Sequence, residues 1–196
     1  KWLKMLLAPG ASLGGARPKA GVTDEKGSLW IAKFPAAGDR GDMGAWEMVA
    51  NELAAGAGID VASGQAKRFN DKHHTYLSKR FDRIGTKRRL HFASAMTLLG
   101  QRDGAEGLSY LDLAAFLIEH GADPKRDLEE LWRRIAFNIA VKNTDDHLRN
   151  HGFLLTAGGW SLAPAYDVNP NEQGRGLTLN ISETDNALEF ELALSV

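Results

Sequence analysis

Three polar side chains stand out as candidates for chemistry, and two of them lie in residues 143–150 (NTDDHLRN). Asp145 stands five positions before Asn150, directly after a run whose apolar residues recur at helical spacing. The third, Asp167, follows a short predicted hairpin. Transfer of a phosphoryl group from a nucleotide requires such a set. One carboxylate orients and deprotonates the attacking hydroxyl, while an amide and a second carboxylate hold magnesium on the phosphates.

The spacing Asp-x-x-x-x-Asn is that of a protein-kinase catalytic loop, although the surrounding His-Arg-Asp and Asp-Phe-Gly motifs are absent from the sequence. Two adjacent carboxylates, Asp145 and Asp146, compete for the role of base. We favour Asp145, because it preserves the kinase spacing to Asn150. His147 and His151 could bind zinc if they lay on one helix, but the sequence offers no evident third ligand.

A glycine-rich segment, residues 12–19 (SLGGARPK), could bind phosphates, because adjacent glycines let backbone N–H groups approach an anion closely. It lacks the Gly-Lys-Ser/Thr of a P-loop and the Gly-x-Gly-x-x-Gly of eukaryotic protein kinases. Taken alone, the segment is more typical of an ordinary loop.

Lys33 lies on an otherwise apolar predicted strand, where the burial of a lysine is costly unless it is paired. It could neutralise the phosphates of a nucleotide, oriented by a glutamate from the next predicted helix, and Glu47 is the candidate. The alternative is a lysine on an edge strand, where a positive charge discourages aggregation.

The elements that must position these side chains follow from hydrophobic periodicity. Short apolar or alternating runs predict strands at residues 29–34, 60–69 and 75–81. Helical spacing of apolar residues predicts helices at residues 46–55, 90–99, 109–120 and 127–139. A hairpin is predicted over residues 153–162, with its turn at Gly158 and Gly159.

The predicted helix ends rest on capping residues. Ser109 and Asp112 form a capping box, Gly121 ends that helix, and Asp127 is expected to cap the last one. The first helix presents its apolar residues on one face, namely Trp46, Val49, Ala50 and Leu53. The last helix is expected to bury a wide stripe, namely Leu128, Leu131, Trp132, Ile135 and Ile139.

Composition is that of an ordinary soluble globular protein. Of 196 residues, 43% are hydrophobic and 25% are charged, which argues against disorder. The formal net charge of -1 provides no global field that would recruit nucleic acid or an acidic membrane. No window approaches the roughly 18 apolar residues of a membrane span. The absence of cysteine excludes disulfides and cysteine-bound metal, and we expect a cytoplasmic protein.

In chain order, these segments resemble the HipA family of bacterial serine/threonine kinases, the toxin components of type II toxin–antitoxin pairs. The resemblance rests on six segments, residues 12–19, 29–35, 47–53, 78–83 (SKRFDR), 143–150 and 163–167 (APAYD). Several matching segments in the right order are more specific than any one of them. Asp146 departs from the family pattern, because a glycine is common at that position.

The resemblance implies an α+β fold that is bilobal and protein-kinase-like, with similarity to phosphatidylinositol-type kinases. It places a β-rich N-lobe at residues 1–82 and a helical C-lobe at residues 83–196, whose end is expected beyond Val196. It implies ATP and Mg²⁺ as cofactors and a protein serine or threonine as acceptor. A small HipB-like DNA-binding antitoxin is the implied partner, through which alone the protein would meet nucleic acid, and no membrane is involved.

The resemblance also assigns residues. Asp145 becomes the catalytic base, Asn150 and Asp167 the metal ligands, and Lys33 the phosphate-binding lysine that Glu47 orients. Ser12 becomes an autophosphorylation site. Further contacts to the nucleotide are implied for Gly14, Gly15, Ala16, Arg17, Lys19, Lys79, Phe81, His147 and Arg149.

Two other functions stay open at this point. A small-molecule or lipid kinase could use the same scaffold, since a fold does not fix the acceptor. A catalytically silent module could instead bind an antitoxin and assist repression. The presence of Lys33, Asp145, Asn150 and Asp167 together favours an enzyme over the silent module.

Overall fold

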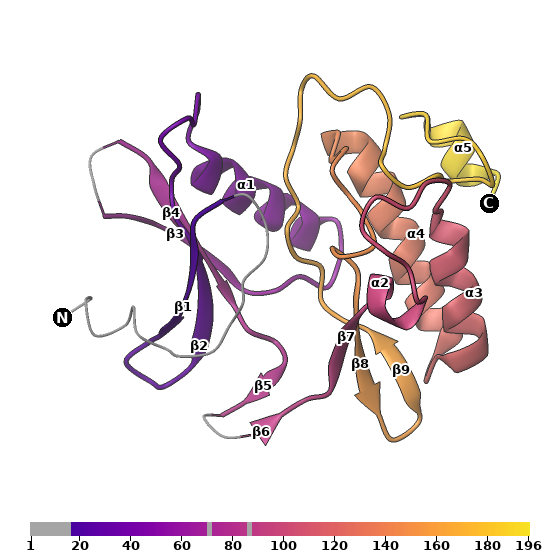
Figure 1. The fold of residues 1–196 in the computed structure, drawn as a ribbon, viewed down its shortest axis with the longest axis horizontal. Coiled ribbons are helices and arrows are strands. Elements are labelled where there is room, and N and C mark those ends of the chain that lie inside the picture. The colour runs from indigo at the N-terminus through magenta and orange to yellow at the C-terminus, as the bar shows by residue number, and fades with distance from the viewer. Residues whose placement is uncertain (1–16, 70–71, 86–87) are drawn as a thin grey trace. The chain divides into compact units, whose positions relative to one another are not determined.

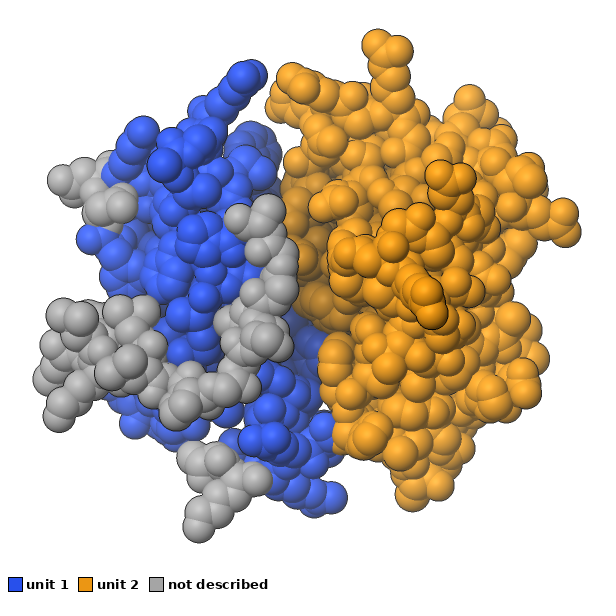
Figure 2. Space-filling model, viewed as in Figure 1, with its two compact units in different colours: residues 1–52, 62–90 blue, residues 53–61, 91–196 orange. Residues whose placement is uncertain are grey.

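A computed structural model describes residues 17–69, 72–85 and 88–196 (Figure 1). The chain divides into two compact units, which Figure 2 shows in different colours. Unit 1 comprises Lys1–Glu52 and Ala62–Leu90, and unit 2 comprises Leu53–Val61 and His91–Val196. Sheets and helices occur in both units, so the fold is mixed α/β.

Unit 1 is built on a four-stranded antiparallel sheet with the order β1-β2-β4-β3. Its strands are β1 (Lys19–Thr23), β2 (Leu29–Lys33), β3 (Gly64–Arg68) and β4 (His74–Lys79). Short strands β5 (Arg83–Ile84) and β6 (Arg88–Arg89) pair with each other beyond it. The strands predicted around residues 29–34, 60–69 and 75–81 are therefore confirmed, with β3 shorter than expected.

Helix α1 (Met43–Gly56) confirms the first predicted helix, but the expected apolar face is wrong. Ala50 is fully buried, whereas Trp46, Val49 and Leu53 are 52%, 42% and 55% exposed. The buried face carries Glu47 beside Ala50.

A close approach of α1 to strand β4 explains this choice of face. A Cβ atom added to Gly44 would lie 2.2 Å from the backbone oxygen of His74, so only a glycine fits there. Because the backbones are so close at Gly44, this glycine and Ala50 occupy the inner face instead of tryptophan or leucine, and Glu47 extends from the same face to Lys33.

Unit 2 contains a three-stranded antiparallel sheet with the order β7-β8-β9. The strands are β7 (Phe92–Ser94), β8 (Gly152–Thr156) and β9 (Gly159–Leu162), and the helices are α2 (Ala95–Leu98), α3 (Tyr110–His120), α4 (Pro124–Val141) and α5 (Phe190–Leu194). Its core is a cluster of buried apolar side chains that includes Leu113, Leu117, Leu131, Ile135, Phe153 and Ile181. The hairpin predicted at residues 153–162 is confirmed by the pairing of β8 with β9.

Two expected helices of unit 2 differ from the prediction. Residues 90–99 begin as strand β7, which pairs with β8, and only Ala95–Leu98 is helical. Helix α4 is capped by Asp123 rather than by Asp127. Asp127 lies inside the helix, where its Oδ2 accepts a hydrogen bond from the Leu162 backbone N–H at 2.9 Å.

Helix α3 agrees with its predicted caps. The Ser109 backbone N–H donates to Asp112 Oδ2 at 2.8 Å, and the helix ends before Gly121. In the stripe of α4, Leu131, Ile135 and Ile139 are buried as expected, while Trp132 is half-exposed. Across the described ranges of the chain, no helix has the length and apolar character needed to cross a membrane.

Candidate active site

Lys33 is a buried, paired lysine on an interior strand. Strand β2 lies between β1 and β4, so the edge-strand alternative is wrong. The Lys33 ammonium donates to Glu47 Oε1, and the two residues are 8% and 5% exposed. The Lys33 Nζ also lies 5.7 Å from the ring centre of Tyr76. A lysine this deeply buried requires such a partner.

The strand register brings a second predicted residue to the same place. Lys19 on β1 stands directly opposite Lys33 on β2. Residues opposite each other in an antiparallel pair extend from the same face of the sheet. Lys19 and Lys33 therefore lie on one face at this end of the sheet, where Glu47 already balances the charge of Lys33.

Arg17, another predicted phosphate ligand, is engaged in an ion pair. Its two terminal nitrogens donate to the two carboxylate oxygens of Asp39, each at 2.7 Å. These hydrogen bonds hold the pKa of Asp39 below its usual value, despite the opposing effect of burial. Ser12, Gly14, Gly15 and Ala16 lie outside the described residues.

Two further residues implied to contact the nucleotide, Lys79 and Phe81, lie at the end of strand β4 and just after it. Lys79 is exposed and stands opposite Trp30, with its Nζ 6.0 Å from the indole centre. Phe81 follows two residues later and is half-buried. Next to it, Asp82 is buried and accepts hydrogen bonds from Arg80 and Arg83.

Residues 143–150 follow the C-terminal end of α4, and the two adjacent aspartates of this segment lie in different environments. Asp145 is exposed, and within the described part of the chain its carboxylate has no hydrogen-bond partner. Asp146 is only 4% exposed. Its Oδ2 accepts three hydrogen bonds, from Tyr110 Oη at 2.6 Å, Asn138 Nδ2 at 2.8 Å and His151 Nε2 at 2.7 Å.

These contacts determine the charge of Asp146. Burial acts to raise its pKa, but the charge and hydrogen bond of His151 and the hydrogen bond of Tyr110 outweigh burial, so the pKa is lowered. Asp146 is therefore a fixed, buried anion. Asp145 is the carboxylate of the pair that an incoming hydroxyl could reach.

Asn150 is tied to the same loop. Its Nδ2 donates to the backbone oxygen of Asp145 at 3.0 Å. That bond uses the nitrogen of the side-chain amide and leaves Oδ1 as an acceptor for a cation. The bond thus fixes the Asn150 side chain against the backbone of Asp145.

Asp167 sits on a strained backbone. Its φ of 61° lies in the left-handed region, which an aspartate tolerates better than most side chains. Its Oδ1 accepts a hydrogen bond from Asn169 Nδ2 at 3.0 Å. Backbone strain of this kind is enriched at functional sites.

The oxygen donors fit Mg²⁺. Asn150 contributes an amide oxygen and Asp167 a carboxylate, and Mg²⁺ prefers oxygen ligands. The described residues contain no cluster of three or more His, Cys, Asp or Glu side chains able to hold a metal by themselves. Mg²⁺ usually takes one or two carboxylates together with waters and substrate phosphates, so such a cluster is not required.

His147 and Arg149 lie together at the loop surface. Arg149 pairs with Asp103, and its Nη2 lies 3.1 Å from His147 Nε2. Because a guanidinium only donates, Nε2 accepts, and a neutral His147 ring carries its proton on Nδ1. That Nδ1 is buried and has no partner among the residues described.

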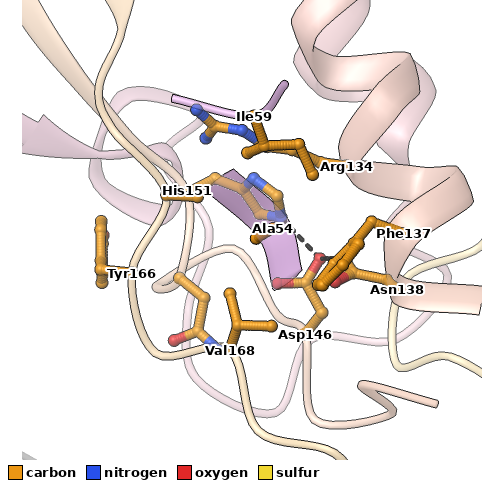
Figure 3. A pocket seen from close by; sticks show the side chains of 11 residues that line it. Ala54, Ile59, Arg134, Phe137, Asn138, Asp146, His151, Tyr166 and Val168 are labelled. Carbon is orange, nitrogen blue, oxygen red and sulfur yellow. Dashed lines mark hydrogen bonds and ion pairs between the residues drawn. The ribbon is translucent and has the colours of Figure 1, made fainter. Parts of the chain in front are cut away.

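A small pocket of unit 2 lies beside residues 143–150 (Figure 3). Arg134, Asn138, Asp146 and His151 supply polar side chains to its wall, and Figure 3 shows Asp146 bonded to His151 and Asn138. Its volume of about 20 Å³ has room for a water molecule but not for a nucleotide.

Sequence reasoning missed the partners of Asp146. Asn138 lies within the apolar stripe of α4. A polar residue in such a stripe indicates a buried hydrogen-bond partner, and this was the available signal. Tyr110 and His151 gave no comparable signal, because only the fold brings them to Asp146.

Two solved structures have similar folds. HipA of Shewanella oneidensis MR-1, solved with HipB and its operator DNA, matches with a TM-score of 0.73 and 20% identity over 91% of this chain and 49% of that chain. The Helicobacter pylori proinflammatory kinase CtkA matches with a TM-score of 0.66 and 16% identity over 86% and 69%, respectively. The fold is therefore kinase-like.

The family follows from the sequence itself. Residues 11–195 match the HipA-like C-terminal domain. The chain belongs to this family, as its motifs indicated.

Two sequence relatives carry kinase names. A "Putative kinase" of Haemophilus influenzae is 30% identical over 123 residues, which is 56% of this chain and 36% of that protein. "Putative kinase Y4mE" of Sinorhizobium fredii is 29% identical over 147 residues, 70% of this chain and 33% of that protein. The chain thus matches about a third of the length of each relative.

Proposed function

We propose that the protein is a HipA-like serine/threonine kinase that transfers the γ-phosphate of ATP to a protein hydroxyl. Membership of the family and the kinase-like fold support this proposal. The observation that carries it is the geometry of residues 143–150, the proposed catalytic loop. There, Asp145 is exposed and without a side-chain partner in the described part of the chain, while Asn150 is bonded to the Asp145 backbone.

Each residue has a separate task in this reaction. Asp145 orients the acceptor hydroxyl and takes its proton as the phosphoryl group is transferred. Asn150 and Asp167 hold Mg²⁺, which neutralises phosphate charge when bound. Lys33 binds the phosphates, and Glu47 holds its ammonium in place.

The remaining contacts surround the nucleotide. We assign phosphate binding to Gly14, Gly15, Ala16 and Lys19, with Arg17 supporting this segment through its bond to Asp39. The segment with Lys79 and Phe81, which connects strand β4 to β5, contacts the adenine. His147 and Arg149 are the remaining proposed contacts to the nucleotide. In this proposal the kinase is bilobal, with residues 1–82 as the N-lobe and residues 83–196 as the C-lobe.

Two regulatory features belong to the same proposal. Ser12 is the autophosphorylation site in this proposal. A phosphate there would add nearly two negative charges to the glycine-rich segment and would repel ATP. A HipB-like DNA-binding antitoxin is the partner. The Shewanella HipA structure, which contains HipB and operator DNA, supports that partner by analogy.

Calorimetry of ATP binding tests the nucleotide site. We expect the affinity for ATP to fall at least tenfold when magnesium is chelated, because Mg²⁺ held by Asn150 and Asp167 would neutralise phosphate charge. Asp167→Ala should bind weakly even with magnesium present. Equal affinities in all three cases would contradict the assigned metal ligands.

A further inference from the structure

A chain of hydrogen bonds joins the buried carboxylate of the catalytic loop to the proposed metal ligand. Asn138 Nδ2 donates to Asp146 Oδ2 at 2.8 Å, and Asn138 Oδ1 accepts from Asn143 Nδ2 at 3.0 Å. Asn143 Oδ1 accepts from the backbone N–H of Asn169 at 3.2 Å. Asn169 Nδ2 then donates to Asp167 Oδ1 at 3.0 Å.

Burial makes this connection specific. Asn138 and Asn143 are 4% and 1% exposed, so water does not compete for their amides. Each of these two side chains uses both its nitrogen and its oxygen within the chain, which fixes the orientation of both amides. The charge of Asp146 at one end polarises the donors that point toward it.

The Asp146 end has its own supports. Tyr110 Oη and His151 Nε2 donate to the same oxygen that Asn138 contacts. Neither Tyr110 nor His151 has a hydrogen bond or ion pair with Asp167.

We propose that Asn138, Asn143 and Asn169, the asparagine chain, position the metal ligand Asp167 relative to the catalytic loop. Tyr110 then acts as a remote positioning residue for the metal site, through Asp146. This inference rests on the proposed function, because it takes Asp167 as the ligand of Mg²⁺. Groups that orient metal ligands commonly change metal affinity by about 10- to 100-fold when they are removed.

The magnesium dependence of ATP turnover measures this effect. Asn169→Ala removes the hydrogen bond to Asp167 and should raise the half-saturating Mg²⁺ concentration by about tenfold. Tyr110→Phe removes one donor to Asp146 and keeps the ring in the core. It should raise the same concentration by roughly threefold. This effect is smaller because Tyr110 reaches Asp167 only through Asp146 and the asparagine chain.

Removal of Asn143, the middle residue of the asparagine chain, distinguishes coupling from general destabilisation. In an Asn143→Ala background, Tyr110→Phe should no longer change the Mg²⁺ dependence, because the connection is already cut. Asn186→Ala is the matched control. The Asn186 side chain donates to the Leu177 carbonyl oxygen at 2.6 Å, outside the asparagine chain, so its Mg²⁺ dependence should equal that of wild type.

A second readout does not need activity. In ¹⁵N-labelled protein, the Asn169 side-chain NH₂ resonances should shift in Tyr110→Phe and not in Asn186→Ala. If they shift while the wild-type protein transfers no phosphate, the coupling stands and the kinase proposal fails. If folded Tyr110→Phe leaves both these resonances and the Mg²⁺ dependence unchanged, the positioning proposal is wrong.

Discussion

At the scale of single residues, Asp145 and Asp146 are chemically identical side chains in opposite environments. Asp145 is exposed, whereas Asp146 is buried beneath three hydrogen-bond donors. The spacing to Asn150 already favoured Asp145 as the base. The structure adds an independent reason to favour Asp145, because the Asp146 carboxylate is buried and already hydrogen-bonded.

Acid stability should report the buried charge of Asp146. Its pKa is lowered in the folded protein, so near pH 4 the unfolded chain binds more protons than the folded one. The charged carboxylate therefore contributes stability above the pKa of an unfolded aspartate, and this contribution is lost as the pH falls through the folded-state pKa. Urea unfolding of wild type and Asp146→Asn should show their difference in free energy shrinking from pH 6 toward pH 3. A constant difference would contradict the fixed anion.

Lys33 permits a separation of structural and functional roles. Lys33→Met leaves Glu47 buried without its cationic partner, which should lower the free energy of unfolding by about 3–5 kcal/mol. Adding Glu47→Gln removes the buried charge and should restore much of that stability. Phosphoryl transfer should stay about a hundredfold or more below wild type in the double variant, because the phosphate-binding cation is gone. A stable and fully active double variant would show that the pair is only structural.

At the scale of elements, helix α1 holds Glu47 in place through its contact with strand β4. Gly44→Ala would drive a methyl group against the His74 carbonyl oxygen and push the helix away. We expect a loss of about 1–3 kcal/mol in the free energy of unfolding and lower kinase activity, because Glu47 moves with the helix. Gly56→Ala, in the same helix with no atom within 4 Å of the added methyl, is the control. Equal stability of the two variants in urea would contradict this account.

Local signals predicted the elements whose ends are marked by capping residues. The Ser109 and Asp112 capping box and Gly121 gave the correct limits of α3. The start of α4 was placed late, although Asp123 before Pro124 is a strong start signal. Strand β7 could not be seen locally, because its pairing partner β8 lies about 60 residues further along the chain.

At the scale of the whole molecule, the order of the motifs identified the family. The spacing within residues 143–150 and the lysine on an apolar strand led to the roles expected of Asp145, Asn150 and Lys33, and these roles stay predictions. The partners of Asp146 could not be predicted, since Tyr110 lies 36 residues away and nothing in its neighbourhood indicates a polar contact. Long-range pairing of buried polar groups is set by the fold and not by local pattern.

The transfer of labelled γ-phosphate from ATP tests the central claim most directly. The full-length protein, incubated with Mg²⁺ and a cell lysate, should label serine or threonine residues of protein. Asp145→Asn should reduce this labelling by about two orders of magnitude or more while ATP binding stays nearly intact, because the base is lost. Asp146→Asn should reduce it much less. Equal labelling by wild type and Asp145→Asn, or label found only in lipids or small molecules, would contradict the account.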